Sequence, residues 1–138
     1  MMRNVYAVLV GMMLAFFLVS VGDSLAGMMF QLPKGLDPND PATKAAFEAA
    51  MLNAPLRAML VMVGGYFVAA LGGAFVARKL VHTPTLIPSL TVGLLLLAAT
   101  VANFAMMKHP MLMMVLGVLV PVPGSWLGAQ LASTKTED

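Results

Sequence analysis

Four long apolar segments alternate with short polar ones along the chain. They cover residues 4–27, 55–77, 86–107 and 110–132. Each is close to the roughly 20 residues that a helix needs to cross the hydrocarbon core of a bilayer. Helix is also the open-chain structure that satisfies its own backbone hydrogen bonds in lipid. The pattern predicts an all-α membrane protein, with four transmembrane helices in one bundle and residues 1–138 forming a single transmembrane domain.

The first segment also has features of a secretory signal peptide. Arg3 gives it a positive start, and the sequence Ser24-Leu25-Ala26 resembles a small-residue cleavage motif. The apolar run over residues 5–21 is longer than a usual signal core, which favours a retained first span. The alternative is cleavage, which leaves three spans.

The loop over residues 28–53 is the longest polar connection. Its first half, QLPKGLDPNDP, is rich in the residues that form turns. Asp40 then stands where a helix N-cap is expected, with Pro41 at the first helical position. We expect a short helix over residues 42–52, with one apolar side and one charged side, lying on the membrane surface or on the end of the bundle.

Composition supports the assignment to a membrane. Of the 138 residues, 60% are hydrophobic and only 10% are charged, and the mean hydropathy is +0.90. A soluble domain carries roughly a quarter charged residues. The eight basic residues are scattered over the loops, whereas a nucleic-acid-binding surface needs them clustered. We therefore expect the lipid bilayer as the surrounding partner, and no nucleic acid.

The basic residues divide evenly between the two sides of the membrane. For an even number of spans, one side carries Arg3, Arg78, Lys79 and Lys135, and the other carries Lys34, Lys44, Arg57 and Lys108. This balance gives the positive-inside rule no preference. The adjacent Arg78 and Lys79 form the densest basic pair. On that basis we expect a multi-pass protein with both termini in the cytoplasm.

The second span carries small residues at every fourth position. Within the near-repeat GGYFVAAL-GGAFVARK they are Gly65, Ala69, Gly73 and Ala77. This spacing puts them on one helix face, and a face of small residues lets two helix backbones approach closely. We expect it to form a close helix contact within the chain or, as the alternative, in a homodimer.

Polar residues of the first three spans are expected to meet at one membrane level. Asp23 lies near the end of span one, Arg57 just inside span two, and Asn103 near the end of span three. Asn103 shares a face with Thr100 on a stripe that also contains Ser89, which should point into the bundle. An ionisable residue inside the membrane is a candidate for function.

We therefore predict a polar or ion site formed by Asp23, Arg57, Asn103 and Thr100, with Asp23 paired to Arg57. The alternative is a structural role, in which both charges reach interfacial water.

The fourth span contains two prolines near its centre. The interrupting sequence includes Pro121, Pro123, Gly124 and Ser125. Proline removes a backbone donor and clashes with the preceding turn, so a midplane helix break is expected, facing the bundle interior. At a functional break, freed N–H groups of Ser125 and Trp126 would face an anionic or polar ligand, and Thr100, Ser89 or trapped water would pair with freed carbonyls. A proline kink that the neighbouring helices heal is the favoured interpretation, and the functional break is the alternative.

The chain carries no catalytic, metal or cofactor signature. It has no cysteine, which excludes disulfides and thiolate chemistry. His82 and His109 stand in different loops without ligands at metal-binding spacing, and the fourteen methionines are dispersed through the spans as apolar filler. We expect no metal and no cofactor.

Three short motifs are distributed over nearly the whole chain: LPKGLDPND after span one, GGAFVAR at the end of span two, and PVPGSWLGAQLA in span four. With the overall layout, they resemble small four-span bacterial inner-membrane proteins without an assigned function. This resemblance implies a four-span fold and brings no catalytic residues. Small multidrug exporters resemble the chain only in span number, because they place an acidic residue deep in span one.

These features favour an accessory or assembly component of a membrane complex, acting with other subunits or as a homo-oligomer. The alternative is a small transporter or channel with a site at the broken fourth span and the level of Asp23. A membrane enzyme is the least favoured class, since no pair of nucleophile and base is visible.

Overall fold

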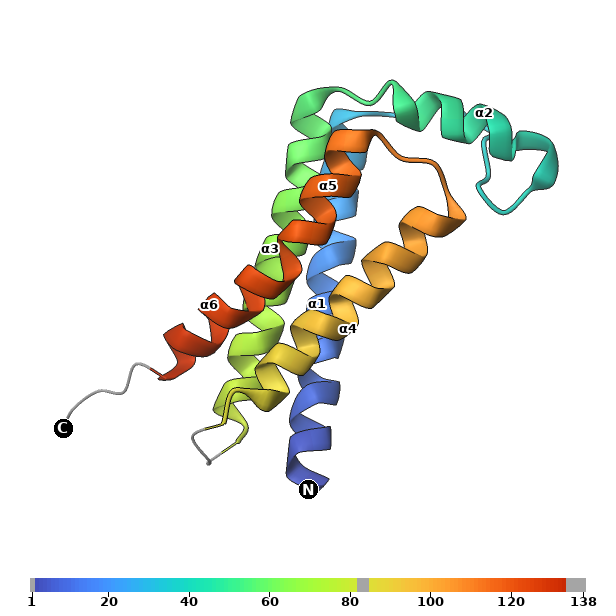
Figure 1. Cartoon of the computed structure of the whole chain (residues 1–138). Coiled ribbons are helices and arrows are strands. Elements are labelled where there is room, and N and C mark those ends of the chain that lie inside the picture. The colour runs from blue at the N-terminus through green and yellow to red at the C-terminus, as the bar shows by residue number, and fades with distance from the viewer. Residues whose placement is uncertain (1, 82–84, 134–138) are drawn as a thin grey trace.

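The computed structural model describes residues 2–81 and 85–133, and within these residues all regular structure is helical (Figure 1). The helices are α1 (Met2–Met29), α2 (Pro41–Leu52), α3 (Leu56–Lys79), α4 (Ile87–Met106), α5 (Met111–Leu119) and α6 (Pro121–Ser133). Four stretches are long and apolar enough to cross a membrane: α1, α3, α4, and α5 together with α6. The chain is a multi-pass membrane protein, and the predicted fold class is confirmed.

Helix α3 is the centre of the bundle. It packs against α1 along its length and also contacts α4, α5 and α6, while α4 lies against both α1 and α6. The end of α3 is tied to the end of α6, because Arg78 Nε donates a hydrogen bond of 3.0 Å to Ser133 Oγ. The start of α1 and the end of α6 lie at the same end of the bundle, opposite α2 (Figure 1).

Small residues fill the interior, and large apolar residues face outward. The buried alanines are Ala7, Ala15, Ala26, Ala58, Ala69, Ala70, Ala74, Ala77, Ala129 and Ala132. Large side chains such as Leu9, Phe17 and Leu94 are more than half exposed. This arrangement suits lipid, because helices in a bilayer associate through close packing and not through removal of apolar surface from water.

Helix α2 lies across one end of the bundle and projects to one side of it (Figure 1). The Asp40 carboxylate accepts a hydrogen bond of 2.9 Å from the Ala42 N–H, and Pro41 occupies the first turn, so the expected cap and surface helix are confirmed. None of the other described helices packs closely on α2. An ion pair of 3.8 Å between Lys108 Nζ and Glu48 Oε2 connects it to the α4–α5 loop.

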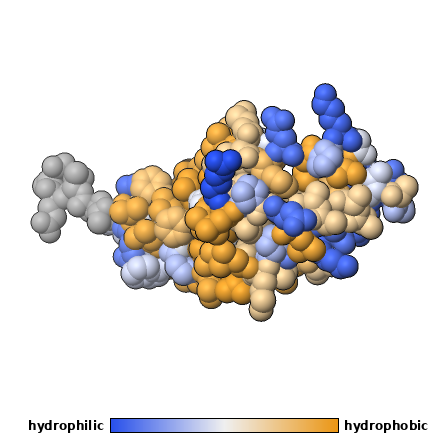
Figure 2. Space-filling model, turned by 90° about the horizontal axis from the view of Figure 1, so that it is seen from above, coloured by the Kyte–Doolittle hydropathy of each residue, from blue (hydrophilic) through white to orange (hydrophobic). Residues whose placement is uncertain are grey.

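The end of the molecule that carries α2 is chemically mixed. Figure 2 looks down on this end and shows hydrophilic side chains interspersed among apolar ones, gathered mainly on the side where α2 lies. Such a surface is suited to the boundary between lipid and water, where apolar side chains enter the bilayer and charged ones stay outside.

Candidate ligand-binding site around Asp23

Asp23 is the only acidic residue within the four described spans. It precedes the end of α1 at Met29 by six residues, so the helical rise places it roughly 9 Å inside that end. Its side chain remains accessible in the bundle, and two cavities adjoin it. No hydrogen bond from the described part of the chain occupies its carboxylate. The carboxylate is therefore available to water or to a ligand.

The first cavity lies between α1, α3 and α4 and has a volume of about 220 Å³. We call it the polar cavity because half of its lining residues have polar side chains and the other half are apolar. Its lining residues are Phe16, Val19, Asp23, Tyr66, Leu96, Ala99, Thr100 and Asn103. Thr100 Oγ1 donates to the Leu96 carbonyl at 2.9 Å, so its proton is committed within α4. The Tyr66 hydroxyl and the Asn103 amide supply further polar groups. A space of this size with several polar groups can hold ordered water.

The structure brings together three of the four residues predicted to form a polar site. Asp23, Thr100 and Asn103 line this cavity, and Arg57 does not. Arg57 is exposed in the first turn of α3 and forms no ion pair with Asp23 among the described residues. Ala58, the next residue, lines the second cavity that adjoins Asp23, and neighbouring positions on a helix point about 100° apart. The predicted pair of Asp23 with Arg57 is therefore wrong.

His109, in the α4–α5 loop, is a titratable neighbour of Asp23 that the sequence pattern did not place there. It is buried, its Nδ1 lies 2.8 Å from the Met107 carbonyl oxygen, and its ring stacks at a tilt on Phe104 with centroids 4.9 Å apart. It interacts electrostatically with Asp23. The signal for it in the sequence is its position just after the end of the third span, at the same membrane side as Asp23.

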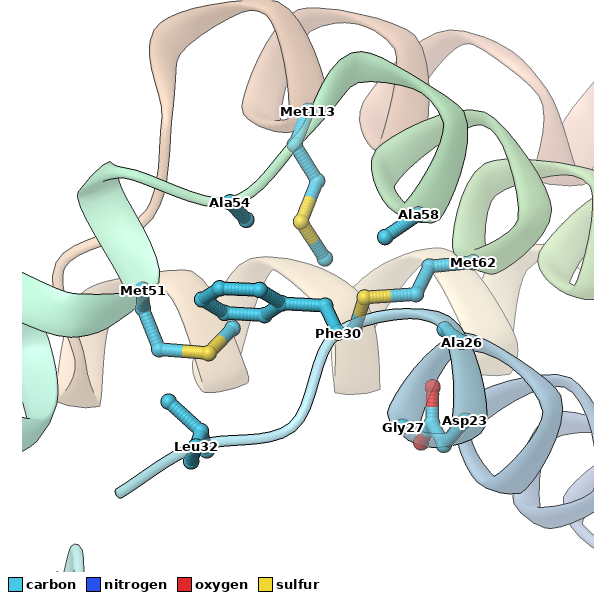
Figure 3. A pocket seen from close by; sticks show the side chains of 10 residues that line it. All are labelled: Asp23, Ala26, Gly27, Phe30, Leu32, Met51, Ala54, Ala58, Met62 and Met113. Carbon is cyan, nitrogen blue, oxygen red and sulfur yellow. The ribbon is translucent and has the colours of Figure 1, made fainter.

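The second cavity adjoining Asp23 is apolar and has a volume of about 150 Å³. Asp23, Ala26, Gly27, Phe30, Leu32, Met51, Ala54, Ala58, Met62 and Met113 line it. Figure 3 shows Phe30 and three methionines around the cavity, with Asp23 at one side beside Ala26 and Gly27. Residues from α1, α2, α3 and α5 thus enclose an apolar space that has a carboxylate at its margin.

The small-residue face of α3 lies against α1. A Cβ atom added to Gly73 would lie 2.6 Å from the Gly11 carbonyl oxygen, and one added to Gly65 would lie 3.1 Å from Gly22 Cα. Ala69 and Ala77, on the same face, are fully buried. The backbones of the two helices are therefore in direct contact, at Gly22 and Gly65 next to Asp23 and at Gly11 and Gly73 further from α2.

The polar stripe of α4 points into the bundle but does not serve the fourth span as expected. Ser89 Oγ donates a hydrogen bond of 2.8 Å to the Ala74 carbonyl of α3. Thr100 bonds within its own helix. Gly93 packs directly against Ser125 of the fourth span, so closely that a Cβ atom at position 93 would collide with it. The predicted hydrogen bonds from Thr100 or Ser89 to the break are therefore wrong.

The fourth span is interrupted at Val120, between α5 and α6, which run in different directions (Figure 1). Pro121, Gly124 and Ser125 are buried against α3 and α4, while Pro123 is exposed. The sequence 121–125 is not an unwound segment: it forms the first turn of α6. Proline explains this, because its fixed φ suits the start of a helix.

This helix start offers almost no free backbone donors. Pro121 and Pro123 have no N–H, and the Gly124 N–H donates to the Val120 carbonyl at 3.0 Å. Ser125 and Trp126 lie far enough into α6 for their N–H groups to bond within the helix. The expectation that these two N–H groups face a ligand is therefore wrong.

Within the described residues, no group of three or more His, Asp or Glu side chains is placed to hold a metal ion. His82 and Lys135 lie outside the described residues. No known protein family matches the chain, and no curated protein and no solved structure matches it either.

Proposed function

We propose that this multi-pass membrane protein is a small transporter that exchanges a monovalent cation for a proton at Asp23. The observation that carries the proposal is the position of this carboxylate: it is the only one in the described spans, and it borders a polar cavity without a protein hydrogen bond. A charge inside a span costs stability, about 2.5–3.5 kcal/mol at the centre of a helix, so it is normally retained for function.

One carboxylate binds either a proton or one cation, which makes exchange the natural mode of coupling. Tyr66, Thr100 and Asn103 supply side-chain oxygen atoms that can replace part of the water shell of a bound cation. The imidazole of His109 is a second titratable group that interacts electrostatically with Asp23. It is oriented by its bond to the Met107 carbonyl and is suited to pass protons to and from the carboxylate.

The remainder of the bundle supports a site that is accessible from one side at a time. Beyond the cavity, α1 and α3 close at Gly11 and Gly73, and α4 and α6 close at Gly93 and Ser125. These contacts leave no space for a side chain, so α1 packs closely on α3, and α4 on α6, in the half of the bundle opposite α2. Alternating access would require these glycine contacts to separate.

The test is proton flux in reconstituted vesicles. Acid-loaded proteoliposomes with a pH-sensitive dye inside receive tetramethylammonium, a permanently charged small cation, on the outside. We expect proton efflux that saturates with cation concentration and is lost in Asp23→Asn. Glu48→Gln, which changes an α2 carboxylate outside the spans, is the matched control and should keep the flux. Equal flux from wild type and Asp23→Asn would contradict the proposal.

The second candidate function, an accessory subunit of a membrane complex, is favoured by Gly64. This glycine is exposed in the middle of α3, and a Cβ added to it would meet nothing within 4 Å. A glycine costs about 1 kcal/mol relative to alanine inside a helix, so its use here suits a second helix that approaches closely, from another subunit or another copy. If so, Gly64→Leu should leave the isolated fold intact and abolish co-purification of a membrane partner or of a tagged second copy.

We also propose the inner membrane as the location, with both termini in the cytoplasm. The support is the dense pair of Arg78 and Lys79 at the end of α3, on the same end of the bundle as the start of α1. Because the chain has no cysteine, single cysteines report topology cleanly. A cysteine at the exposed Asn39 should react with a membrane-impermeant maleimide from outside intact cells, and one at Lys79 should not. The reverse labelling would overturn the orientation.

A further inference from the structure

We infer that the cation bound at Asp23 is lipophilic: a quaternary ammonium or similar group attached to an apolar, preferably aromatic, body. This inference rests on the proposed function and names its substrate class. It is carried by the two cavities, one polar and one apolar, that share Asp23 as a lining residue.

The cavities are stacked along the helices with Asp23 at their junction. On α3, Ala58 and Met62 line the apolar cavity, and Tyr66, one turn further along the same face, lines the polar one. On α1, Ala26 lies on the apolar side of Asp23, and Val19 lies on the polar side. A ligand that extends through both cavities would therefore pass the Asp23 carboxylate where the two cavities adjoin.

The volumes favour a ligand that occupies both spaces. The cavities measure about 220 Å³ and about 150 Å³. Sites for drug-sized ligands begin at roughly 300 Å³, so neither space alone takes such a molecule. A simple inorganic ion would need only the polar one. The apolar cavity beside the carboxylate is therefore the feature that a hydrated ion leaves unexplained.

The lining chemistry matches a cation with an apolar body. Met51, Met62 and Met113 present flexible, polarisable thioethers, which adapt to irregular apolar shapes, and Phe30 lies among them (Figure 3). Across the junction, Asp23 supplies the negative charge, and the aromatic ring of Tyr66 can attract the positive group as well. The apolar cavity offers no second charge, since Asp23 is its only ionisable lining residue.

A matched pair of cations tests this inference separately from the proposed function. Tetramethylammonium and benzyltrimethylammonium have the same kind of charged group, and only the second has an aromatic body. In the vesicle assay, we expect benzyltrimethylammonium to half-saturate proton efflux at a concentration about tenfold or more below that of tetramethylammonium, as burial of a phenyl group implies.

Filling the apolar cavity should remove that difference. Ala54, in the short connection before α3, faces the cavity and is only partly buried, so Ala54→Phe fills the space with little disturbance of helix packing. We expect the two cations to half-saturate proton efflux of Ala54→Phe at the same concentration. Ala58→Leu is the second variant, and Gly64→Ala, which adds bulk outside both cavities, is the control.

The outcomes distinguish the two ideas. Flux that depends on Asp23 but is half-saturated by both cations at the same concentration overturns the lipophilic substrate and keeps the exchanger. A benzyl preference that survives both Ala54→Phe and Ala58→Leu also overturns the inference, because the apolar body then binds elsewhere. Absence of any flux that depends on Asp23 overturns the proposed function itself.

Discussion

Replacing Gly73 with alanine should separate α1 from α3. The added Cβ would lie 2.6 Å from the Gly11 carbonyl oxygen, 3.0 Å from Ala15 Cβ and 3.1 Å from Val92 Cγ1. The nearest of these atoms belongs to a helix backbone and cannot rotate away. The clash can therefore be relieved only if the whole of α1 moves away from α3, and this movement weakens the other contacts between the two helices.

The magnitude is best obtained from a comparison with Gly64→Ala in the same helix. Both variants gain the same helix propensity, about 1 kcal/mol for alanine over glycine, so this contribution cancels in their difference. At Gly64 the new methyl group meets nothing within 4 Å, whereas at Gly73 it overpacks the interface. Overpacking a close-packed core costs roughly 1–3 kcal/mol, and that is the expected gap in unfolding free energy between the two variants.

The assay is thermal unfolding of the purified proteins in the same detergent, monitored by circular dichroism. Gly64→Ala should melt at or above the wild type, and Gly73→Ala should melt below it, with the two variants at least roughly 3 °C apart. Gly73→Leu should lower the yield of folded protein further. If Gly73→Ala melted together with Gly64→Ala, the α1–α3 backbone contact would be wrong as described.

Two further interfaces allow equally direct tests. Gly93→Ala should destabilise the bundle by collision with Ser125, and Ser125→Gly in the same chain should restore part of the loss; strictly additive losses in melting experiments would contradict this contact. Ser89→Ala removes the 2.8 Å hydrogen bond to the Ala74 carbonyl and should cost about 0.6 kcal/mol, whereas Ser24→Ala, at an exposed serine that bonds within its own helix, should be neutral. Equal effects of the two serine substitutions would show that the bond between helices adds nothing.

The spans and the surface helix could be read from local pattern because each depends on neighbouring residues. A run of about 20 apolar residues determines a transmembrane helix through its own hydrogen bonds. Asp40 and Pro41 determine the start of α2 through contacts within one turn. The four-residue spacing of Gly65 and Gly73 likewise identified a face that allows close approach, although it did not say which helix would approach.

Which residues form the candidate site depends on their depth in the membrane and on the rotation of each helix about its axis. Only the depth can be inferred from the sequence. Counting residues from the span ends placed Asp23, Thr100 and Asn103 at a common level, and they line one cavity. It placed Arg57 there as well, although Arg57 points away from the cavity. The electrostatic interaction of His109 with Asp23 cannot be inferred from the sequence, because a loop residue has no helical periodicity that gives its direction.

The fourth span shows the same division. Two prolines predicted an interruption, and the chain is interrupted at Val120. The following residues begin a helix and do not unwind, because the fixed φ of Pro121 suits a first helical position, and Gly124 and Ser125 then fit against α3 and α4. The sequence by itself determined how many helices cross the membrane and where they end, because hydrogen bonding and hydropathy are local. Only the tertiary structure decided which faces meet and what surrounds Asp23, because those depend on the rotation of each helix about its axis, which packing against the other helices determines.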